Sequence, residues 1–417
     1  MFSKESFQSK VRVLFLVDYC LTPHERIPRA GILCEGERVL AVGGSSAFTQ
    51  EMGLRVVELD GVYAVPGFVD THIHGAGKFD SSLAAEPGQD IKSMCETLVS
   101  HGITAFLPTI VSNTSEKMMA TLAALADAIE GGDCPCEPVG VHVEGPFINP
   151  EKRGAQATSY IREVDLGEAR ELLAAARNHI KIMTLAPELK NSISLIEMLG
   201  EKDVIPSMGH SLADEREFLK AVDAGASRCT HLFNGMAPLH QRKVGLAAMS
   251  LVDNRIAVEL ILDERLIHPR MIELACRSKP KSKIIGISDA VEGAGLASDG
   301  AYHLGDREIE IRAGKVTTKE GTIAGTTQTL EKGWRHLAEA SHMPMTEAAA
   351  CLTVNPARSI GLSKRGEIRP GYIADIAFFD SETHKPRMTV SRGEVVYDSE
   401  KKIGGPATPS KPKKHKR

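Results

Sequence analysis

Residues 66–75 read Pro66-Gly-Phe-Val-Asp-Thr-His-Ile-His-Gly75 and contain the most informative signal for the fold of the chain. It begins as an apolar run typical of a buried strand and ends at a glycine turn. His72 and His74 alternate along it, so on a strand their side chains point to the same face. A (β/α)8 barrel carries its active site at the ends of its strands, and histidine is a common metal ligand. Histidines at the end of a buried strand therefore predict a metal site in such a barrel.

The chain from residue 63 to 363 repeats a pattern of short apolar strands and helical segments. Such alternation is typical of a parallel sheet, so we expect a (β/α)8 TIM-type barrel of the metal-dependent hydrolase kind. The predicted strands are Ala64–Asp70, Thr104–Val111, Val139–Val143, Ile182–Leu185, Val204–Met208, Arg228–His231, Ala257–Leu262 and Lys283–Ile287. The predicted helices include Ser115–Ile129, Asp165–Ala176, Asp214–Ala224, Pro269–Arg277, Gln328–Ala340 and Thr346–Ile360.

The two ends of the chain have a different, β-like texture. The runs Val11–Leu16, Gly31–Cys34, Arg38–Val42 and Leu54–Leu59 are separated by turn residues, and β-like runs return at 366–380 and Lys385–Tyr397. We therefore expect residues 1–62 and 364–402 to form one small β-sandwich domain beside the barrel. Residues 403–417 are rich in proline, lysine and serine, and they predict a disordered basic tail.

Composition sets the outer limits on function. Hydrophobic residues make up 42% and charged residues 25%, which is ordinary for a globular protein, and the net charge of −4 gives no sign of nucleic-acid or membrane binding. The mostly apolar Val11–Val17 is too short to span a bilayer. Eight cysteines without a repeated spacing favour a reducing, cytoplasmic location. Cys134 and Cys136 have the spacing of a metal or redox pair, but their place in a Gly/Asp/Pro-rich loop favours chance neighbours.

Four further metal-binding groups lie at the ends of other predicted strands. Glu144 ends the third strand, while His210, His231 and Asp289 lie at the ends of the fifth, sixth and eighth strands. Imidazoles and carboxylates suit Zn²⁺ or Fe²⁺. Because the strand ends of a barrel converge, these groups predict one site for one or two ions, and hence a hydrolase that activates water and polarises a carbonyl.

Asp289 admits two interpretations. A lone aspartate after a strand is more often a helix N-cap. Beside a metal ion, the same carboxylate can accept a proton from water and return it to a leaving amine. We expect Asp289 to be the catalytic acid/base as well as a group near the metal.

These residues and their flanks resemble the N-acetylglucosamine-6-phosphate deacetylases of the amidohydrolase superfamily. The resemblance runs from about Pro66 to Asp380, and the small β-domain also fits. The motifs that carry it are His142-Val-Glu-Gly-Pro-Phe147, Arg153-Gly-Ala-Gln156, Thr184-Leu-Ala-Pro-Glu188, Gly209-His-Ser211, Thr230-His-Leu-Phe-Asn-Gly-Met236, Ser288-Asp-Ala290 and Ile323-Ala-Gly-Thr326.

The resemblance implies hydrolysis of N-acetylglucosamine-6-phosphate to glucosamine-6-phosphate and acetate. It gives the main ion to Glu144, His210 and His231, indicates a second ion at His72 and His74, and makes Asp289 the acid/base. It implies sugar contacts from Ala155, Gln156, Asn234, Gly235, Ile323, Ala324 and Gly325. Arg242 matches an arginine that reaches the phosphate of a substrate in the neighbouring subunit, which implies a homodimer.

One position departs from the family pattern. After the seventh strand the family usually has Asp-Gly-X-His, whose histidine contacts the sugar phosphate, but this chain reads Asp263-Glu-Arg-Leu266. His268 is two residues further on, and a strand-end register seldom tolerates such a slip. Arg265 is the other candidate cation. The hydrolytic groups are complete, whereas the groups that recognise the substrate are altered.

Other functions stay open. One alternative is a related amidohydrolase for another N-acyl substrate, such as N-acetylgalactosamine-6-phosphate or an N-acyl amino acid. Cyclic amidases that bridge two ions with a modified lysine on the fourth strand are disfavoured, because Ile182–Leu185 contains none and Lys181 precedes it. A non-catalytic binding subunit is the remaining alternative, motivated by Leu266 and opposed by the complete set of metal-binding groups.

Overall fold

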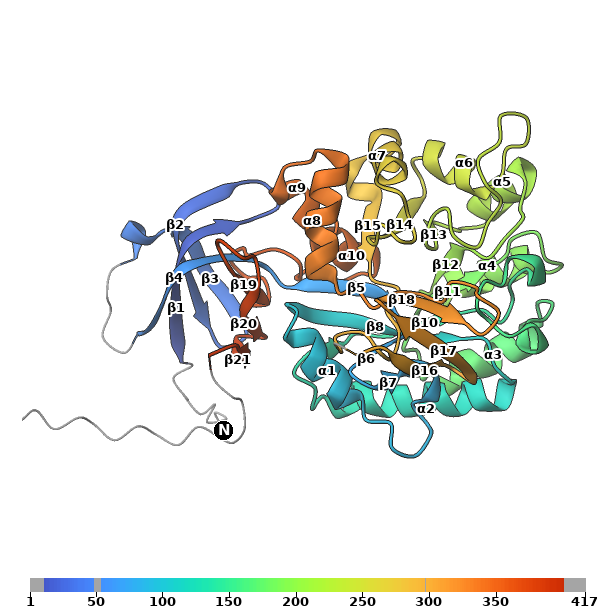
Figure 1. The fold of residues 1–417 in the computed structure, drawn as a ribbon, viewed down its shortest axis with the longest axis horizontal. Helices are drawn as coiled ribbons and strands as arrows, with labels where there is room; N and C mark the ends of the chain where they lie inside the picture. Colours follow the sequence, from blue (N-terminus) through green and yellow to red (C-terminus); the bar gives the residue numbers. More distant parts are fainter. Residues whose placement is uncertain (1–10, 49–53, 297, 401–417) are drawn as a thin grey trace, which may run out of the picture.

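The computed structural model describes residues 11–48, 54–296 and 298–400. The predicted basic tail at 403–417 lies outside these ranges. Figure 1 shows a barrel joined to a separate sheet that contains strands from both ends of the chain. Among the described residues, no helix combines the length and the apolar character needed to cross a membrane.

Eight parallel strands form the barrel, and they confirm the predicted fold class. Their order in the sheet is β15-β14-β13-β12-β11-β10-β8-β5, with the short β9 (Glu137–Pro138) paired to β8. The strands are β5 (Phe68–Ile73), β8 (Ile103–Val111), β10 (Val141–Glu144), β11 (Ile180–Leu185), β12 (Ile205–Met208), β13 (Arg228–Cys229), β14 (Ala257–Ile261) and β15 (Ile284–Ile287).

Helices cover the outside of the barrel. They are α1 (Ile91–Val99), α2 (Ser115–Gly131), α3 (Leu166–Ala175), α4 (Ser192–Gly200), α5 (Glu215–Asp223), α6 (Leu246–Val252), α7 (Pro269–Ser278), α8 (Leu330–Ser341), α9 (Met345–Ala350) and α10 (Val354–Ser359). Helix α5 shows why they form: Asp214 and Glu217 make a capping box, and Phe218, Ala221 and Val222 give it one buried face.

The barrel closes between β5 and β15. Just past the strand ends, the Asp289 N–H donates to His72 O at 3.0 Å, and the His74 N–H donates to Ala290 O at 2.8 Å. Leu352 O accepts the N–H of Val69 at 2.9 Å from the loop between α9 and α10. The predicted helix Thr346–Ile360 is therefore divided into α9 and α10. Between them, the carbonyl of Leu352 accepts a hydrogen bond from a barrel strand and does not continue a helix.

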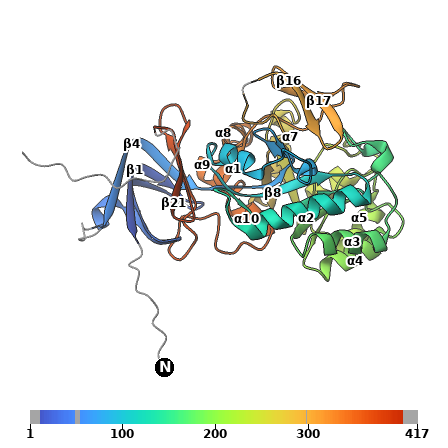
Figure 2. The same cartoon turned by 90° about the horizontal axis from the view of Figure 1, so that it is seen from below.

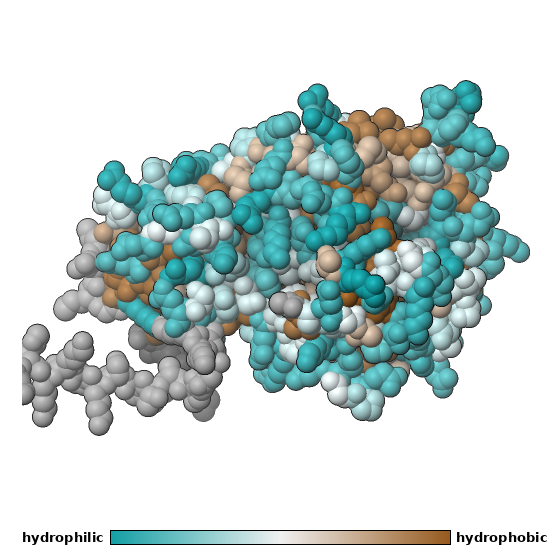
Figure 3. Space-filling view, viewed as in Figure 1, coloured by the Kyte–Doolittle hydropathy of each residue, from teal (hydrophilic) through white to brown (hydrophobic). Residues whose placement is uncertain are grey.

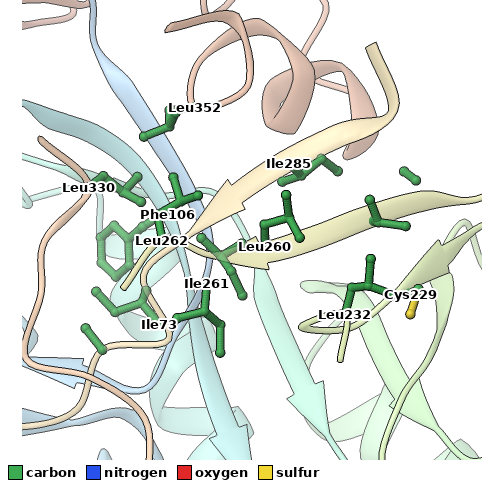
Figure 4. Close-up of a cluster of buried hydrophobic side chains, with 14 of the residues drawn as sticks. Ile73, Phe106, Cys229, Leu232, Leu260, Ile261, Leu262, Ile285, Leu330 and Leu352 are labelled. Atoms are coloured by element: carbon green, nitrogen blue, oxygen red, sulfur yellow. The ribbon is translucent and has the colours of Figure 1, made fainter. Parts of the chain in front are cut away.

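Buried apolar side chains pack between the barrel strands and the helices around them. Figure 4 shows Ile73 and Phe106 from β5 and β8 beside Leu260 and Ile285 from β14 and β15. All four side chains are buried within the same core cluster. Burial of such apolar surface is the main favourable contribution to folding. Its close packing holds the strands that carry the site residues in fixed positions.

The strands at the two ends of the chain meet in one sheet of order β21-β20-β19-β4-β1-β2-β3. They are β1 (Arg12–Leu21), β2 (Arg26–Glu35), β3 (Arg38–Gly44), β4 (Arg55–Pro66), β19 (Ile376–Asp380), β20 (Pro386–Ser391) and β21 (Glu394–Asp398). Phe15, Ile32 and Phe378 belong to its own core. This confirms that both ends build one β-domain, while its exact boundaries stay a prediction.

A three-stranded antiparallel sheet between β15 and α8 was not predicted. It consists of β16 (Gly300–Leu304), β17 (Arg307–Arg312) and β18 (Lys315–Thr318), and Figure 2 shows it standing out from the barrel. Ile309 and Ile311 of β17 pack in one cluster with Val111 and Ala155 from the mouth of the barrel. A small hairpin of β6 (Gly75–Ala76) and β7 (Phe79–Asp80) follows β5.

Candidate metal centre

The structure brings all six predicted metal-site residues together at the carboxyl ends of the barrel strands. His72 and Glu144 lie on β5 and β10, and the other four follow β5, β12, β13 and β15 directly. All six side chains are buried. His210, His231 and Asp289 have positive φ angles of 48°, 30° and 51°. Strained backbone of this kind gathers at functional sites, where the surrounding structure holds it.

The first group is Glu144, His210 and His231. Glu144 Oε1 lies 3.1 Å from His210 Nε2 and 3.0 Å from His231 Nε2, and the two Nε2 atoms are 3.0 Å apart. His210 Nδ1 donates to Lys152 O at 2.6 Å, so its Nε2 carries the lone pair. Two imidazole nitrogens and a carboxylate oxygen facing one point are the donor set of a borderline divalent cation.

The second group is His72, His74 and Asp289. His72 Nε2 and His74 Nε2 are 3.3 Å apart, and Asp289 Oδ1 lies 3.4 Å and 3.2 Å from them. His74 Nδ1 donates to the Thr109 carbonyl at 3.2 Å, which leaves its Nε2 free to bind an ion. These three atoms also form a donor set that fits a cation.

Glu144 connects the two groups. Its Oε1 lies 3.4 Å from His72 Nε2, and its Oε2 lies 3.6 Å from His74 Nε2. Burial acts to raise the pKa of Glu144, but the neighbouring imidazoles of His210, His231 and His72 hold it well below its ordinary value. Glu144 is therefore an anionic carboxylate at neutral pH and can serve both groups.

A cavity of about 280 Å³ lies over these groups. The predicted sugar-contact residues all line it: Ala155, Gln156, Asn234, Gly235, Ile323, Ala324 and Gly325. Arg242 does not line it and is exposed on the loop before α6. The structure thus places every predicted substrate contact except Arg242 around the metal-site residues of the same subunit.

Leu266 also lines this cavity, whereas the two candidate replacement cations do not. His268 is exposed and accepts the N–H of Arg270 as the N-cap of α7. Arg265 Nη1 pairs with Asp263 Oδ2 at 3.1 Å. An apolar side chain therefore occupies the predicted phosphate-binding position.

Sequence reasoning missed two contacts with the site. Gln156 Nε2 donates to Glu144 Oε2 at 2.9 Å, so the side chain of this predicted sugar contact holds a metal-site carboxylate. Glu259 on β14 accepts from His72 Nδ1 at 3.0 Å and pairs with Arg228 on β13. The sequence does contain one indication of the contact between these two residues. Glu259 and Arg228 are each the only charged residue of a short buried strand, and buried charges are normally paired.

A (β/α)8 barrel with imidazoles and carboxylates at its strand ends is the architecture of a hydrolase. The amidohydrolase family model matches residues 63–402, and the chain belongs to this family. Within it, the chain groups with the N-acetylglucosamine-6-phosphate deacetylases, as the sequence motifs predicted.

Three relatives give the measure of this similarity. The N-acetylglucosamine-6-phosphate deacetylase of Bacillus subtilis (strain 168) is 33% identical, over 80% of this chain and 85% of the relative. The N-acetylgalactosamine-6-phosphate deacetylase of Escherichia coli O157:H7 is 30% identical, over 83% of this chain and 91% of the relative. The crystal structure of the Thermotoga maritima N-acetylglucosamine-6-phosphate deacetylase superposes with a TM-score of 0.81 at 31% identity, covering 93% of this chain and 100% of that one.

Proposed function

We propose that this protein hydrolyses the N-acetyl amide of an amino-sugar 6-phosphate, with N-acetylglucosamine-6-phosphate as the first candidate. The products are acetate and the free amine. The observation that carries the proposal is that one cavity joins both metal-binding groups to the predicted sugar contacts. The relatives act, by their names, on the 6-phosphates of N-acetylglucosamine and N-acetylgalactosamine.

The proposed metal centre holds one or two ions of zinc or iron. Glu144, His210 and His231 would hold the main ion, and His72, His74 and Asp289 would hold the second, with Glu144 near enough to serve both groups. When bound, such an ion supplies a Lewis acid that eases the deprotonation of water and polarises the acetyl carbonyl. The hydrogen bonds of His210 and His74 support this assignment. In each ring Nδ1 donates to a backbone carbonyl, so Nε2 is unprotonated and faces the other residues of its group.

Asp289 is the proposed acid/base. The assignment is supported by its carboxylate, which lines the cavity and has Oδ1 3.2 Å from His74 Nε2, beside the second group. After accepting the proton of the attacking water, the same carboxyl protonates the leaving nitrogen, without which the C–N bond does not break. The hydrogen bond from the Asp289 N–H to His72 O keeps this residue in place.

Arg242 is the proposed phosphate contact, and it acts across a homodimer. Its guanidinium can donate two parallel hydrogen bonds to phosphate oxygens. Support comes from its position, because Arg242 is exposed and lies outside the cavity of its own subunit. We also propose a cytoplasmic location, which is supported by eight cysteines that are all free.

A second candidate substrate is N-acetylgalactosamine-6-phosphate. It is favoured by the 30% identical relative from Escherichia coli O157:H7 and by Leu266, which changes the surface that the substrate meets. The epimers differ in the direction of one ring hydroxyl, so a site that hydrogen-bonds this hydroxyl in one direction leaves its own polar groups unpaired with the other epimer.

A deacetylation screen tests the proposal. N-acetylglucosamine, N-acetylgalactosamine and N-acetylmannosamine are each assayed with and without the 6-phosphate, and acetate and free amine are measured together. We expect equal amounts of both products from at least one phosphorylated sugar. Absence of acetate from all six compounds, with metal bound, would refute the proposal and favour an N-acyl amino acid substrate or a non-catalytic role.

A further inference from the structure

We infer that Glu259 is a positioning residue that fixes the tautomer of His72 and thereby creates the second metal-binding group. The inference rests on the metal centre of the proposed function and concerns how the chain prepares it. Glu259 is fully buried in the wall of the barrel, one layer below the cavity, and does not line it.

The hydrogen bonds of Glu259 leave His72 only one productive tautomer. Glu259 Oε2 accepts from His72 Nδ1 at 3.0 Å. An ionised carboxylate can only accept, so the proton of the neutral imidazole must be on Nδ1. His72 Nε2 then carries a lone pair, and it faces His74, Glu144 and Asp289 at 3.3–3.4 Å.

The same carboxylate oxygen holds the other group through the main chain. Glu259 Oε2 also accepts the His231 N–H at 3.1 Å, at a residue whose φ is +30°. One atom therefore restrains a side chain of the second group and the backbone of the first. Loss of the acceptor at Oε2 would therefore change the tautomer of His72 and also remove the acceptor of the His231 N–H.

Arg228 decides which oxygen of Glu259 is available. Its Nε donates to Glu259 Oε1 at 2.7 Å, while its other nitrogens bond to Thr71 Oγ1 and Ser359 Oγ. Arg228 and Glu259 have exposed fractions of 1% and 0%. Burying an ion pair is often no more stabilising than apolar packing, so its presence here needs a reason other than stability. Keeping Oε2 as a permanent acceptor for His72 is such a reason.

The variant Glu259→Gln tests the inference because Arg228 controls the orientation of the new amide. Arg228 Nε needs an acceptor, so the amide oxygen takes the place of Oε1 and the NH2 group turns towards His72. His72 Nδ1 must then accept a hydrogen bond from this NH2 group, so the ring proton moves to Nε2. His72 Nε2 loses the lone pair with which it would bind the second ion. In the double variant Arg228→Met with Glu259→Gln, the amide oxygen is free to turn back to His72.

We expect Glu259→Gln to weaken binding of the second ion by about 10- to 100-fold, the usual effect of losing the hydrogen-bond partner of a ligating histidine. The double variant should recover most of this loss. Ions per chain are measured by elemental analysis across a series of chelator concentrations. Long-range ¹H–¹⁵N spectra of the metal-free proteins, recorded at a pH at which the His72 imidazole is neutral, report its tautomer directly. Glu331→Gln is the matched control, because Glu331 is a buried carboxylate that accepts from His101 outside the site.

Two results would overturn the inference. One is a metal-free Glu259→Gln protein in which His72 keeps its proton on Nδ1 and the second ion binds as in the wild type. The other is an equal loss of the ion in the single and double variants, which would indicate a merely structural role. Failure of the proposed function gives a different result. A wild-type protein with less than one ion per chain would contradict the proposed metal centre. The spectra of the metal-free proteins would still test whether Glu259 fixes the tautomer of His72.

Discussion

The side-chain amide of Gln156 donates a hydrogen bond of 2.9 Å to Oε2 of Glu144, the carboxylate that lies between the two metal-binding groups. The amide cannot turn over, because Gln156 Oε1 accepts both the N–H and the hydroxyl of Ser112. The loop between β10 and α3 therefore fixes the orientation of Glu144.

The variant Gln156→Leu should lower kcat/KM by about 10- to 100-fold, because Glu144 loses the donor that orients it. Metal titration should show weaker binding at the same time. Gln89→Leu is a suitable control, since Gln89 accepts the Asp80 N–H away from the cavity. Unchanged kcat/KM in Gln156→Leu would show that Glu144 needs no such support.

Asp289→Asn should lower kcat by roughly 10²- to 10⁴-fold, because the amide can neither accept the proton of water nor return it to the leaving amine. The ion held by Glu144, His210 and His231 should remain, since these residues are untouched. Elemental analysis and steady-state kinetics on one preparation check both statements. A kcat near that of the wild type would assign the proton transfer to another group.

Arg242→Gln should raise KM for the phosphorylated sugar by roughly 10- to 100-fold, because a hydrogen bond to a charged group is lost. The KM for the unphosphorylated sugar should not change. Lys243→Gln, at the adjacent exposed position, is the control. An equal rise in KM for both substrates would show that Arg242 does not contact the phosphate.

Lys279 should contribute stability that grows with pH in the mildly alkaline range. Burial lowers its pKa to about 8 from 10.5, and its Nζ donates to the Asp253 carbonyl at 2.7 Å. Between these two values Lys279 binds more protons in the unfolded chain than in the folded one, so its contribution to the free energy of unfolding increases as pH rises. The gain is on the order of 3 kcal/mol, at about 1.4 kcal/mol per pKa unit.

The comparison with Lys279→Met isolates this contribution from other groups that titrate in the same range. Denaturant unfolding of both proteins between pH 7.5 and about 10.5 gives the difference in free energy at each pH. We expect the difference to shift in favour of the wild type as pH rises. A constant difference across the range would contradict the lowered pKa of Lys279.

Much of the barrel could be predicted from the sequence because its strands are short, apolar and locally marked. The run Ile182–Leu185, for example, lies within β11 (Ile180–Leu185), and the metal-binding residues follow from the rule that strand ends converge. The sheet β16–β18 was missed although the run Arg307-Glu-Ile-Glu-Ile-Arg312 alternates like a strand, and its place over the barrel is not marked locally. Its buried isoleucines pack on Val111 and Ala155, which are far away in the chain, so no local pattern marks their partners.

The candidate site shows the same division. Six metal-site residues could be named because residue type and strand end coincide. Gln156 was assigned to the sugar because its motif resembled the family, and its contact with Glu144 depends on how the loop folds back over β10. Glu259 was missed because its partner His72 lies on β5, far away in the chain, and only the folded barrel brings it within hydrogen-bond distance of β14.

The arrangement of β4 has a consequence for the order in which the chain acquires structure during synthesis. This strand pairs with β1 on one side and β19 on the other, and it leads almost directly into β5. A ribosome therefore releases β4 and β5 long before β19 and the closing carbonyl of Leu352 exist. The barrel and the β-domain therefore each have an unpaired strand edge until most of the described chain has emerged. Unpaired strand edges favour association with other chains. The last strands to be made protect the first.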